Sequence, residues 1–300
     1  MNNILSVVWD VNPDILKIGP FTLRYYGILF ISGFILGYWL FVKFFRKEGI
    51  PQKGEAADLL NPLLITLLLS TLIGARLGHV LFYQPDHYLA HPIEIFKVWE
   101  GGLASHGGAI GVLIGIWLYV RKYGKKNGFD YIWLLDRLVI CICFAGAFIR
   151  FGNLMNSEIY GDVTNLPWGF VFVRAGETLA KHPTQIYEAF SYILLGLALL
   201  WAYWYKLDKL KRGTIFGIFL IGLFGARFLI EYIKEPQVEF EVGMLMNMGQ
   251  ILSLPFIIAG VAILIWSLLK GKPAGIDKIE RPVKTKPKSD GTLKYAKPKS

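Results

Sequence analysis

The stretch from Gly146 to Gly161 places several polar side chains at the end of a long apolar segment. These side chains are Arg150, Asn153, Asn156 and Glu158. An arginine inside a membrane segment costs about 2.5–3.5 kcal/mol on insertion scales, so it is seldom retained without a function. Guanidinium groups bind phosphates and carboxylates well because they donate two parallel hydrogen bonds. We therefore expect Arg150 to bind an anion at membrane depth.

The composition is typical of a membrane protein. Hydrophobic residues make up 54% of the chain and charged residues only 18%, whereas about a quarter of the residues in a soluble domain are charged. The formal net charge is +10, but most basic residues fall in loops and in the C-terminal tail, so we expect no nucleic-acid partner. Cys141 and Cys143 share one apolar run, and no other cysteine exists to complete a metal site with them.

Seven segments are long and apolar enough to cross about 30 Å of hydrocarbon. They lie near residues 25–44, 59–83, 104–120, 131–151, 185–205, 213–233 and 248–269. We predict an all-α polytopic membrane protein whose seven-helix transmembrane domain is 1–270, with extracytoplasmic loops of which 152–184 is the largest. Residues 271–300 are basic and rich in lysine and proline, and we expect a disordered cytoplasmic tail. Glycine pairs such as Gly111/Gly115 favour close helix packing.

The connections between these segments alternate in their content of basic residues. The loops after spans one, three and five, together with the tail, hold 22 lysines and arginines, and the loops on the other side hold 6. By the positive-inside rule, the N-terminus faces outward and the C-terminus faces the cytoplasm. The N-terminus lacks the features of a cleaved signal peptide, so the first span is expected to direct insertion. Arg137 and Asp136, near the cytoplasmic end of span four, are interpreted as a structural anchor.

This orientation places basic groups from several spans in the outer half of the bilayer. They are Arg76, His106, Arg150 and Arg227, and Tyr26 opens the first span at the same level. We therefore expect an electropositive cavity that is reached from the outer leaflet. Two structural alternatives remain open, namely a buried ion pair between Arg227 and Glu231, and pairing of Arg76 with a loop carboxylate.

Five motifs along the chain resemble those of bacterial prolipoprotein diacylglyceryl transferases. They are GGLASHGGAIG with His106, GAFIRFGNLMNSEIYG with Arg150, HPTQIYE at 182–188, GARFLIEYIKEPQ with Arg227, and MGQILSLP at 248–255. The resemblance implies an enzyme that moves the diacylglyceryl group of phosphatidylglycerol onto the lipobox cysteine of a prolipoprotein signal peptide. The implied products are a thioether and glycerol 1-phosphate, and the resemblance implies that no metal and no cofactor are needed. It also implies an inner-membrane protein, surrounded by membrane lipids, with its active site facing outward.

The resemblance further implies roles for individual residues. The candidate catalytic residues are His106, Arg150, Arg227 and Tyr26, and the candidate phosphatidylglycerol-binding residues are Arg150, Arg227, Asn153, Glu158, Gly161 and Glu231. The acceptor thiol, with a pKa near 8.5, must lose its proton, and His106 and Tyr26 are the candidate bases. Lys234, Arg24 and His79 differ from the residues common at these positions, which puts secondary contacts in doubt.

A transporter or flippase for an anionic lipid is the alternative function, because it would also require intramembrane arginines. Such a protein is expected to show internal repeats and polar residues that reach the cytoplasmic half of the membrane. This sequence has no repeat at a fixed period, and its polar cluster stops in the outer half. An inactive scaffold does not explain several arginines at one depth. The pattern therefore favours the transferase.

Overall fold

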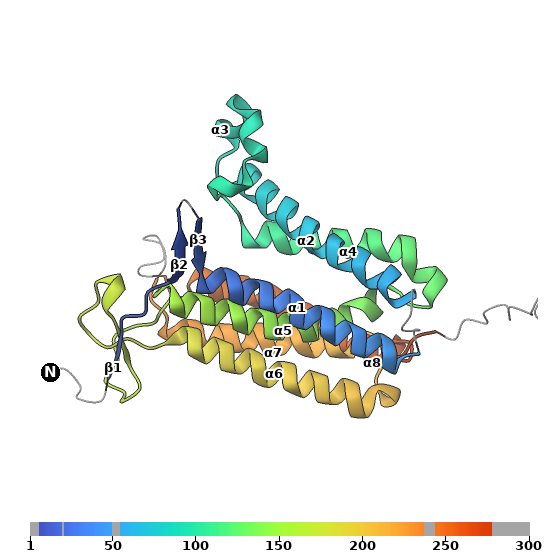
Figure 1. Cartoon of the computed structure of the whole chain (residues 1–300). Helices are drawn as coiled ribbons and strands as arrows, with labels where there is room; N and C mark the ends of the chain where they lie inside the picture. The colour runs from blue at the N-terminus through green and yellow to red at the C-terminus, as the bar shows by residue number, and fades with distance from the viewer. Residues whose placement is uncertain (1–5, 20, 50–54, 237–243, 278–300) are drawn as a thin grey trace, which may run out of the picture.

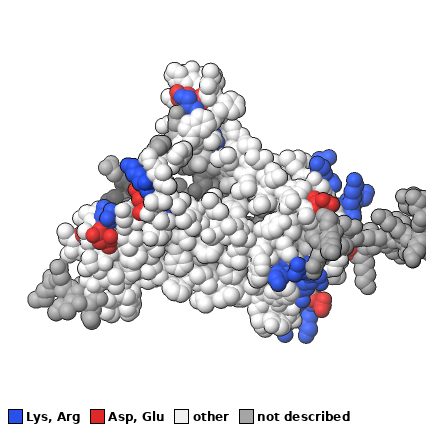
Figure 2. Space-filling model, viewed as in Figure 1, with Lys and Arg blue, Asp and Glu red and all other residues white. Residues whose placement is uncertain are grey.

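The computed structural model describes residues 6–19, 21–49, 55–236 and 244–277, and long helices dominate it (Figure 1). Six helices in this part of the chain are long and apolar enough to cross a membrane. They are α1 (Tyr25–Lys47), α2 (Glu55–Phe82), α5 (Tyr131–Met155), α6 (Thr184–Lys206), α7 (Thr214–Ile230) and α8 (Met248–Lys270). In the view of Figure 2, charged side chains gather at the left, at the right and at the top over α3, and an apolar surface lies between them. The predicted all-α membrane class is confirmed, and the orientation of the termini stays a prediction.

The third predicted span forms helix α4 (Ser105–Asn127), which is not among these six helices. Its apolar stretch is short, because the basic sequence RKYGKKN follows it directly. The helix packs along α2 in an antiparallel hairpin, and glycines bring the two backbones together. A Cβ atom on Gly107 would lie 2.4 Å from the carbonyl oxygen of Gly74, and one on Gly115 would lie 2.7 Å from Ser70. The close packing predicted from the glycine spacing is confirmed here.

Short elements cluster at the end of the bundle where α1 begins. Strand β1 (Val7–Trp9) pairs in parallel with β4 (Phe170–Phe172), and β2 (Asp14–Ile18) pairs with β3 (Phe21–Arg24) in an antiparallel hairpin. Helix α3 (Pro85–Ala90) and the 3-10 helices η1 (Pro92–Phe96) and η2 (Val98–Glu100) connect α2 to α4. The remaining 3-10 helices are η3 (Val173–Ala175), η4 (Leu207–Lys209) and η5 (Glu231–Ile233).

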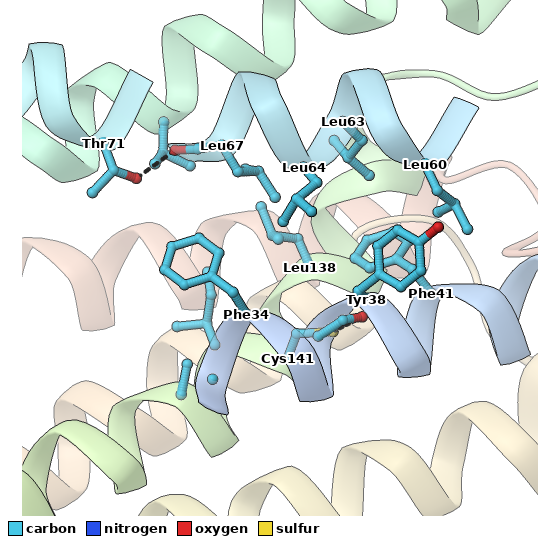
Figure 3. Close-up of a pocket in the computed structure, with 15 residues that line it drawn as sticks. Phe34, Tyr38, Phe41, Leu60, Leu63, Leu64, Leu67, Thr71, Leu138 and Cys141 are labelled. Atoms are coloured by element: carbon cyan, nitrogen blue, oxygen red, sulfur yellow. Dashed lines mark hydrogen bonds between the residues drawn. The ribbon is translucent and has the colours of Figure 1, made fainter. Parts of the chain in front are cut away.

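The α2–α4 hairpin meets the bundle of α1, α5, α6, α7 and α8 at the end away from β2 and β3 (Figure 1). The shared core at that end includes Leu59, Leu63, Ile116, Phe44 and Trp133, all of them buried. Towards the other end the hairpin diverges from α1, and an apolar groove lies between α1, α2 and α5 (Figure 3). The hairpin is therefore held firmly at one end only.

Arg137 pairs with Glu48 at the end of α1, and not with the adjacent Asp136 as the sequence suggested. Arg137 donates to Glu48 Oε1 from Nε at 2.9 Å and from Nη2 at 2.7 Å. Trp133 and Tyr203 also donate to the Glu48 carboxylate, at 2.9 and 2.7 Å. Glu48 is thus a shared acceptor that ties α1, α5 and α6 together, in keeping with the rule that buried charges are paired.

Asp136 has a different function, because neighbouring residues on a helix point in different directions. Its carboxylate accepts hydrogen bonds from the backbone N–H groups of Gly213 and Phe216, each at 2.8 Å. These groups begin α7, where the first helical N–H groups have no partner within the helix. Asp136 therefore fixes the start of α7 against α5, and the predicted anchor consists of two separate contacts.

The first residues of the predicted disordered tail are packed against the bundle, which corrects the boundary placed at 271. Arg137 donates to the carbonyl oxygen of Ala274 at 2.7 Å, and Arg212 binds Asp277 and the carbonyl oxygen of Gly275, both at 2.8 Å. Buried guanidinium groups require acceptors, and this segment supplies them. The predicted disorder of residues 278–300 lies outside the described residues.

Candidate active site

Arg150 lies near the end of α5 and interacts with Glu188, Asn153 and Tyr192. Its Nε is 2.8 Å from Oε2 of Glu188, which projects from α6 and is fully buried. Its Nη1 donates to Asn153 Oδ1 at 3.3 Å, as expected for residues three positions apart on a helix. The Arg150 side chain is 13% exposed. The guanidinium group is therefore fixed in orientation while part of it remains accessible.

The hydrogen-bond network continues from Asn153 to Glu158 beyond the end of the helix. Asn153 Nδ2 donates to Glu158 Oε1 at 2.7 Å, and Asn156 Nδ2 donates to the same oxygen at 3.2 Å. The polar residues that the sequence places between Gly146 and Gly161 thus form one connected group. Arg150 lies at one end of this group and Glu158 at the other.

The backbone around Glu158 is strained. Ser157 and Ile159, on either side of it, have φ angles of 54° and 62°, in the left-handed region. Each such residue costs about 1–3 kcal/mol, which surrounding contacts must offset. Here Gln185 donates to the carbonyl oxygen of Glu158 at 2.7 Å, and Thr184 donates to that of Ile159 at 3.0 Å. The start of α6 therefore holds the turn that positions Glu158.

Lys234 connects the carboxylates of α6 and η5. Its Nζ lies 3.5 Å from Glu188 Oε1 and 3.5 Å from Glu231 Oε2. Burial lowers the pKa of Lys234, and the neighbouring Glu188 carboxylate opposes this effect. The backbone of Lys234 also forms a bridge with that of Gly161, so the loop after α5 and the end of α7 are joined at this point.

Arg227 differs from the other cations of the cluster because the described part of the chain gives it no carboxylate partner. Among the described residues, its side chain forms no hydrogen bond or ion pair, and Glu231 pairs with Lys234 instead. Tyr192 and Lys234 each interact electrostatically with both Arg150 and Arg227, which places the two arginines in one cluster. The alternative of an Arg227–Glu231 ion pair is therefore not observed. Arg227 is available to an external anion.

Tyr26 reaches the same cluster from the start of α1. A Cβ atom on Gly152 would lie 2.7 Å from Cδ2 of Tyr26, so the ring packs directly on the backbone of α5. Tyr26 is half-buried and interacts electrostatically with Glu158 and Arg150. A side chain at position 152 would displace the ring. Tyr26 can therefore occupy this position only because residue 152 is glycine.

The cluster is balanced in charge, which corrects the expected electropositive cavity. Its cations are Arg150, Arg227 and Lys234, and its carboxylates are Glu158, Glu188 and Glu231. Buried cations require counter-charges in a medium of low dielectric constant, and Glu188 was absent from the expected carboxylates. The positive potential is consequently local to Arg227 and to the exposed part of Arg150.

Arg76 does not belong to this cluster. It is buried, and its guanidinium group donates to the carbonyl oxygens of Ile95, Gly101 and Glu94 at 2.9, 2.7 and 2.5 Å. These acceptors belong to the segment between α2 and α4. Arg76 therefore stabilises this connection, which excludes it from the predicted cavity, and its acceptors are backbone carbonyls and not the loop carboxylate of the alternative.

His106 also lies apart from the arginines. It is exposed at the start of α4, and its ring lies 5.8 Å from those of Phe82 and Tyr83. No hydrogen bond or ion pair among the described residues joins it to Arg150 or Arg227. The hairpin that carries His106 diverges from the bundle (Figure 1), and the prediction that His106 shares one cavity with the arginines stays a prediction.

Gly161 provides a test of how tightly this site is packed. A Cβ atom there would lie 2.2 Å from the carbonyl oxygen of Ile233, so Gly161→Ala must displace the segment that carries Lys234. We expect a loss of stability of about 1–3 kcal/mol and a fall in activity, because overpacking shifts the backbone. Melting temperature and transfer rate should be compared with Gly225→Ala, where the added methyl group meets open space. Equal behaviour of the two variants would contradict the packing account.

The sequence-based site omitted Glu188. It is a fully buried carboxylate within an apolar span, and an ionisable residue in such a position is a functional candidate by default. The same rule singled out Arg150, so the signal was present. Glu158 and Glu231 were expected at the site, but Glu188 was not, although it lies in the HPTQIYE motif.

Known proteins resemble this chain over most of its length. Residues 13–266 match the family model described as prolipoprotein diacylglyceryl transferase. A protein of Tolumonas auensis named phosphatidylglycerol–prolipoprotein diacylglyceryl transferase is 47% identical over 260 residues, covering 86% of this chain and 96% of its own length. Proteins of the same name from Porphyromonas gingivalis and Chloroherpeton thalassium are 43% and 41% identical, covering 86% and 93% of this chain and 94% and 99% of their own lengths.

Proposed function

This chain belongs to the prolipoprotein diacylglyceryl transferase family, and from that premise we propose how its charged cluster carries out the transfer. The protein is a transferase that moves the diacylglyceryl group from phosphatidylglycerol to prolipoprotein. The acceptor in our proposal is the lipobox cysteine of the signal peptide. Its thiolate attacks the glycerol carbon that bears the phosphate, a C–S bond forms, and the C–O bond to phosphate breaks.

The leaving group explains the requirement for cations. The lipid phosphate begins as a singly charged diester and departs as glycerol 1-phosphate, a monoester that gains the electron pair of the broken bond. Arg227 and the exposed part of Arg150 bind the phosphate and stabilise this added charge. Preorganised donors in a site with little water are the most effective groups for that purpose. The observation that carries the proposal is that Arg227 has no partner among the described residues, beside an Arg150 that is fixed by Glu188 and Asn153.

The apolar groove beside α1 suits the acyl chains of the donor. Phe34 and Tyr38 of α1 face Leu64 and Leu67 of α2 across it, and Cys141 of α5 lies at its base (Figure 3). Almost no polar atoms line this groove, so it offers acyl chains an environment like that of the bilayer. A lipid with its acyl chains in this groove and its phosphate at Arg227 would lie where the α2–α4 hairpin and the bundle separate.

The orientation of the protein follows from its basic loops. We place the charged cluster at the outer face of the bacterial inner membrane, with the lysine-rich loops in the cytoplasm. The signal peptide of a translocated prolipoprotein also reaches that face. A site at the outer ends of α5 and α7 therefore meets both substrates.

The thiol proton requires an acceptor, and we assign that function to His106. It is exposed at the start of α4 and thus accessible to a peptide, whereas Tyr26 packs against Gly152. His106→Gln should lower the transfer rate at neutral pH by a factor of about ten or more, because only a few per cent of an ordinary cysteine is ionised there. The rate should recover as the pH passes about 8.5, where the thiolate forms without a base.

The measurement is the transfer rate to a lipobox peptide between neutral and alkaline pH, with Tyr26→Phe as the matched variant. Recovery of the histidine variant alone supports the assignment. If only the Tyr26→Phe variant regains its transfer rate at alkaline pH, Tyr26 is the base and the assignment to His106 is wrong.

A further inference from the structure

Glu188 is a fully buried carboxylate that lies between two cations from different elements. Its Oε2 is 2.8 Å from Arg150 Nε, and its Oε1 is 3.5 Å from Lys234 Nζ. Neither of its oxygens accepts a hydrogen bond among the described residues, so ion pairing alone holds the carboxylate in place. A charge buried in this way is costly unless its partners compensate it. Its position therefore depends on Arg150 and Lys234, and their positions depend on it.

The contact with Arg150 is made at one edge of the guanidinium group. Glu188 engages Nε, while Asn153 accepts a hydrogen bond from Nη1. Two contacts at different atoms of a planar group fix both its position and the direction of its plane. Phosphate recognition by arginine depends on that direction, because the paired N–H groups must face the phosphate oxygens.

We propose that Glu188 is a positioning residue for the transfer, which holds Arg150 in the orientation that meets the lipid phosphate. Glu188 cannot contact the lipid itself, because none of its surface is exposed. The inference rests on the proposed phosphate-binding function of Arg150. Lys234 completes the arrangement by compensating the second oxygen of Glu188.

A purely electrostatic function makes a different prediction. If Glu188 served only to balance charge, any change that restored the balance would restore the site. If Glu188 orients Arg150, the double change at Glu188 and Lys234 still removes the contact that orients the Arg150 guanidinium group. The two functions can therefore be separated with a pair of variants.

The test compares Glu188→Gln with the double variant Glu188→Gln/Lys234→Met in detergent–phosphatidylglycerol mixed micelles. The rate of thioether formation is measured against the mole fraction of lipid and expressed per folded enzyme. Misplacement of a catalytic contact by about 1 Å costs up to 10²-fold. We therefore expect kcat/KM to fall by about 10–10²-fold in both variants, with a raised KM for the lipid. Glu94→Gln, which changes a partly exposed carboxylate on η1 away from the charged cluster, should match the wild type.

Recovery of wild-type kcat/KM in the double variant would overturn the proposal, because charge balance alone would then suffice. A fall in folded protein without a change in KM would overturn it as well. The double variant, with balanced charge, keeps the test valid if Glu188→Gln alone does not fold. Lack of thioether formation by the wild type would instead count against the proposed function. Wild-type activity with an unaffected Glu188→Gln variant would count against this inference alone.

Discussion

Replacing Arg150 by glutamine is expected to reduce thioether formation by about 10³-fold or more, because removing a single stabilising donor costs 10²–10³-fold and arginine also carries the charge. The variant retains a hydrogen-bonding amide, but it loses the ion pair with Glu188 at 2.8 Å. Glu188 then keeps only Lys234, at 3.5 Å, and breaking a buried ion pair by removing one partner destabilises a protein by about 3–5 kcal/mol. The Arg150→Gln protein should therefore be both inactive and less stable.

The measurement combines a transfer assay with a melting temperature on the purified protein. Arg121→Gln is the matched control, since Arg121 is exposed on α4 and stacks on Trp117 away from the charged cluster. It should retain both wild-type activity and wild-type stability. Normal transfer by the Arg150 variant would remove the basis for assigning the phosphate to this residue.

Arg227→Gln is expected to separate activity from stability. Because Arg227 has no ion-pair partner among the described residues, its removal leaves no described carboxylate uncompensated, and the melting temperature should stay close to that of the wild type. The transfer rate should still fall by about 10²–10³-fold, since the phosphate loses a charged donor.

This contrast between the two arginines can be checked directly. Binding of phosphatidylglycerol in the absence of peptide should weaken in the Arg227 variant, and a loss of stability as large as that of Arg150→Gln would contradict the geometry. Such a result would indicate that Arg227 is mainly a structural residue. The Arg121→Gln control applies here as well.

The depth of polar residues could be predicted from the sequence, but their direction around the bundle could not. Arg150 and Arg227 were expected at one level and do share a cluster, because α5 and α7 belong to the same bundle. Arg76 and His106 were expected at that level too, yet both lie on the α2–α4 hairpin or its connection. Span positions give the height of a residue, whereas packing between helices decides which residues meet.

Two further differences have the same origin. The extent of the packed chain up to Asp277 depends on Arg137 and Arg212, whose guanidinium groups bind backbone carbonyls that no composition rule identifies. The function of Glu188 could not be predicted because the sequence does not show that this glutamate pairs with Arg150. In both cases the decisive interaction joins residues far apart in the sequence. Local patterns predicted the helices well because a helix depends on neighbouring residues, and they missed these contacts because the contacts join distant residues.

We propose that this protein forms a thioether at a prolipoprotein cysteine with phosphatidylglycerol as the donor. The most direct test of this proposal is the mass of a lipobox peptide after incubation with the purified protein and phosphatidylglycerol, compared with a peptide in which serine replaces the cysteine. We predict that the cysteine peptide gains one diacylglyceryl group, with release of an equal amount of glycerol phosphate, and that the serine peptide stays unchanged. An unmodified cysteine peptide in the presence of folded protein would contradict the account.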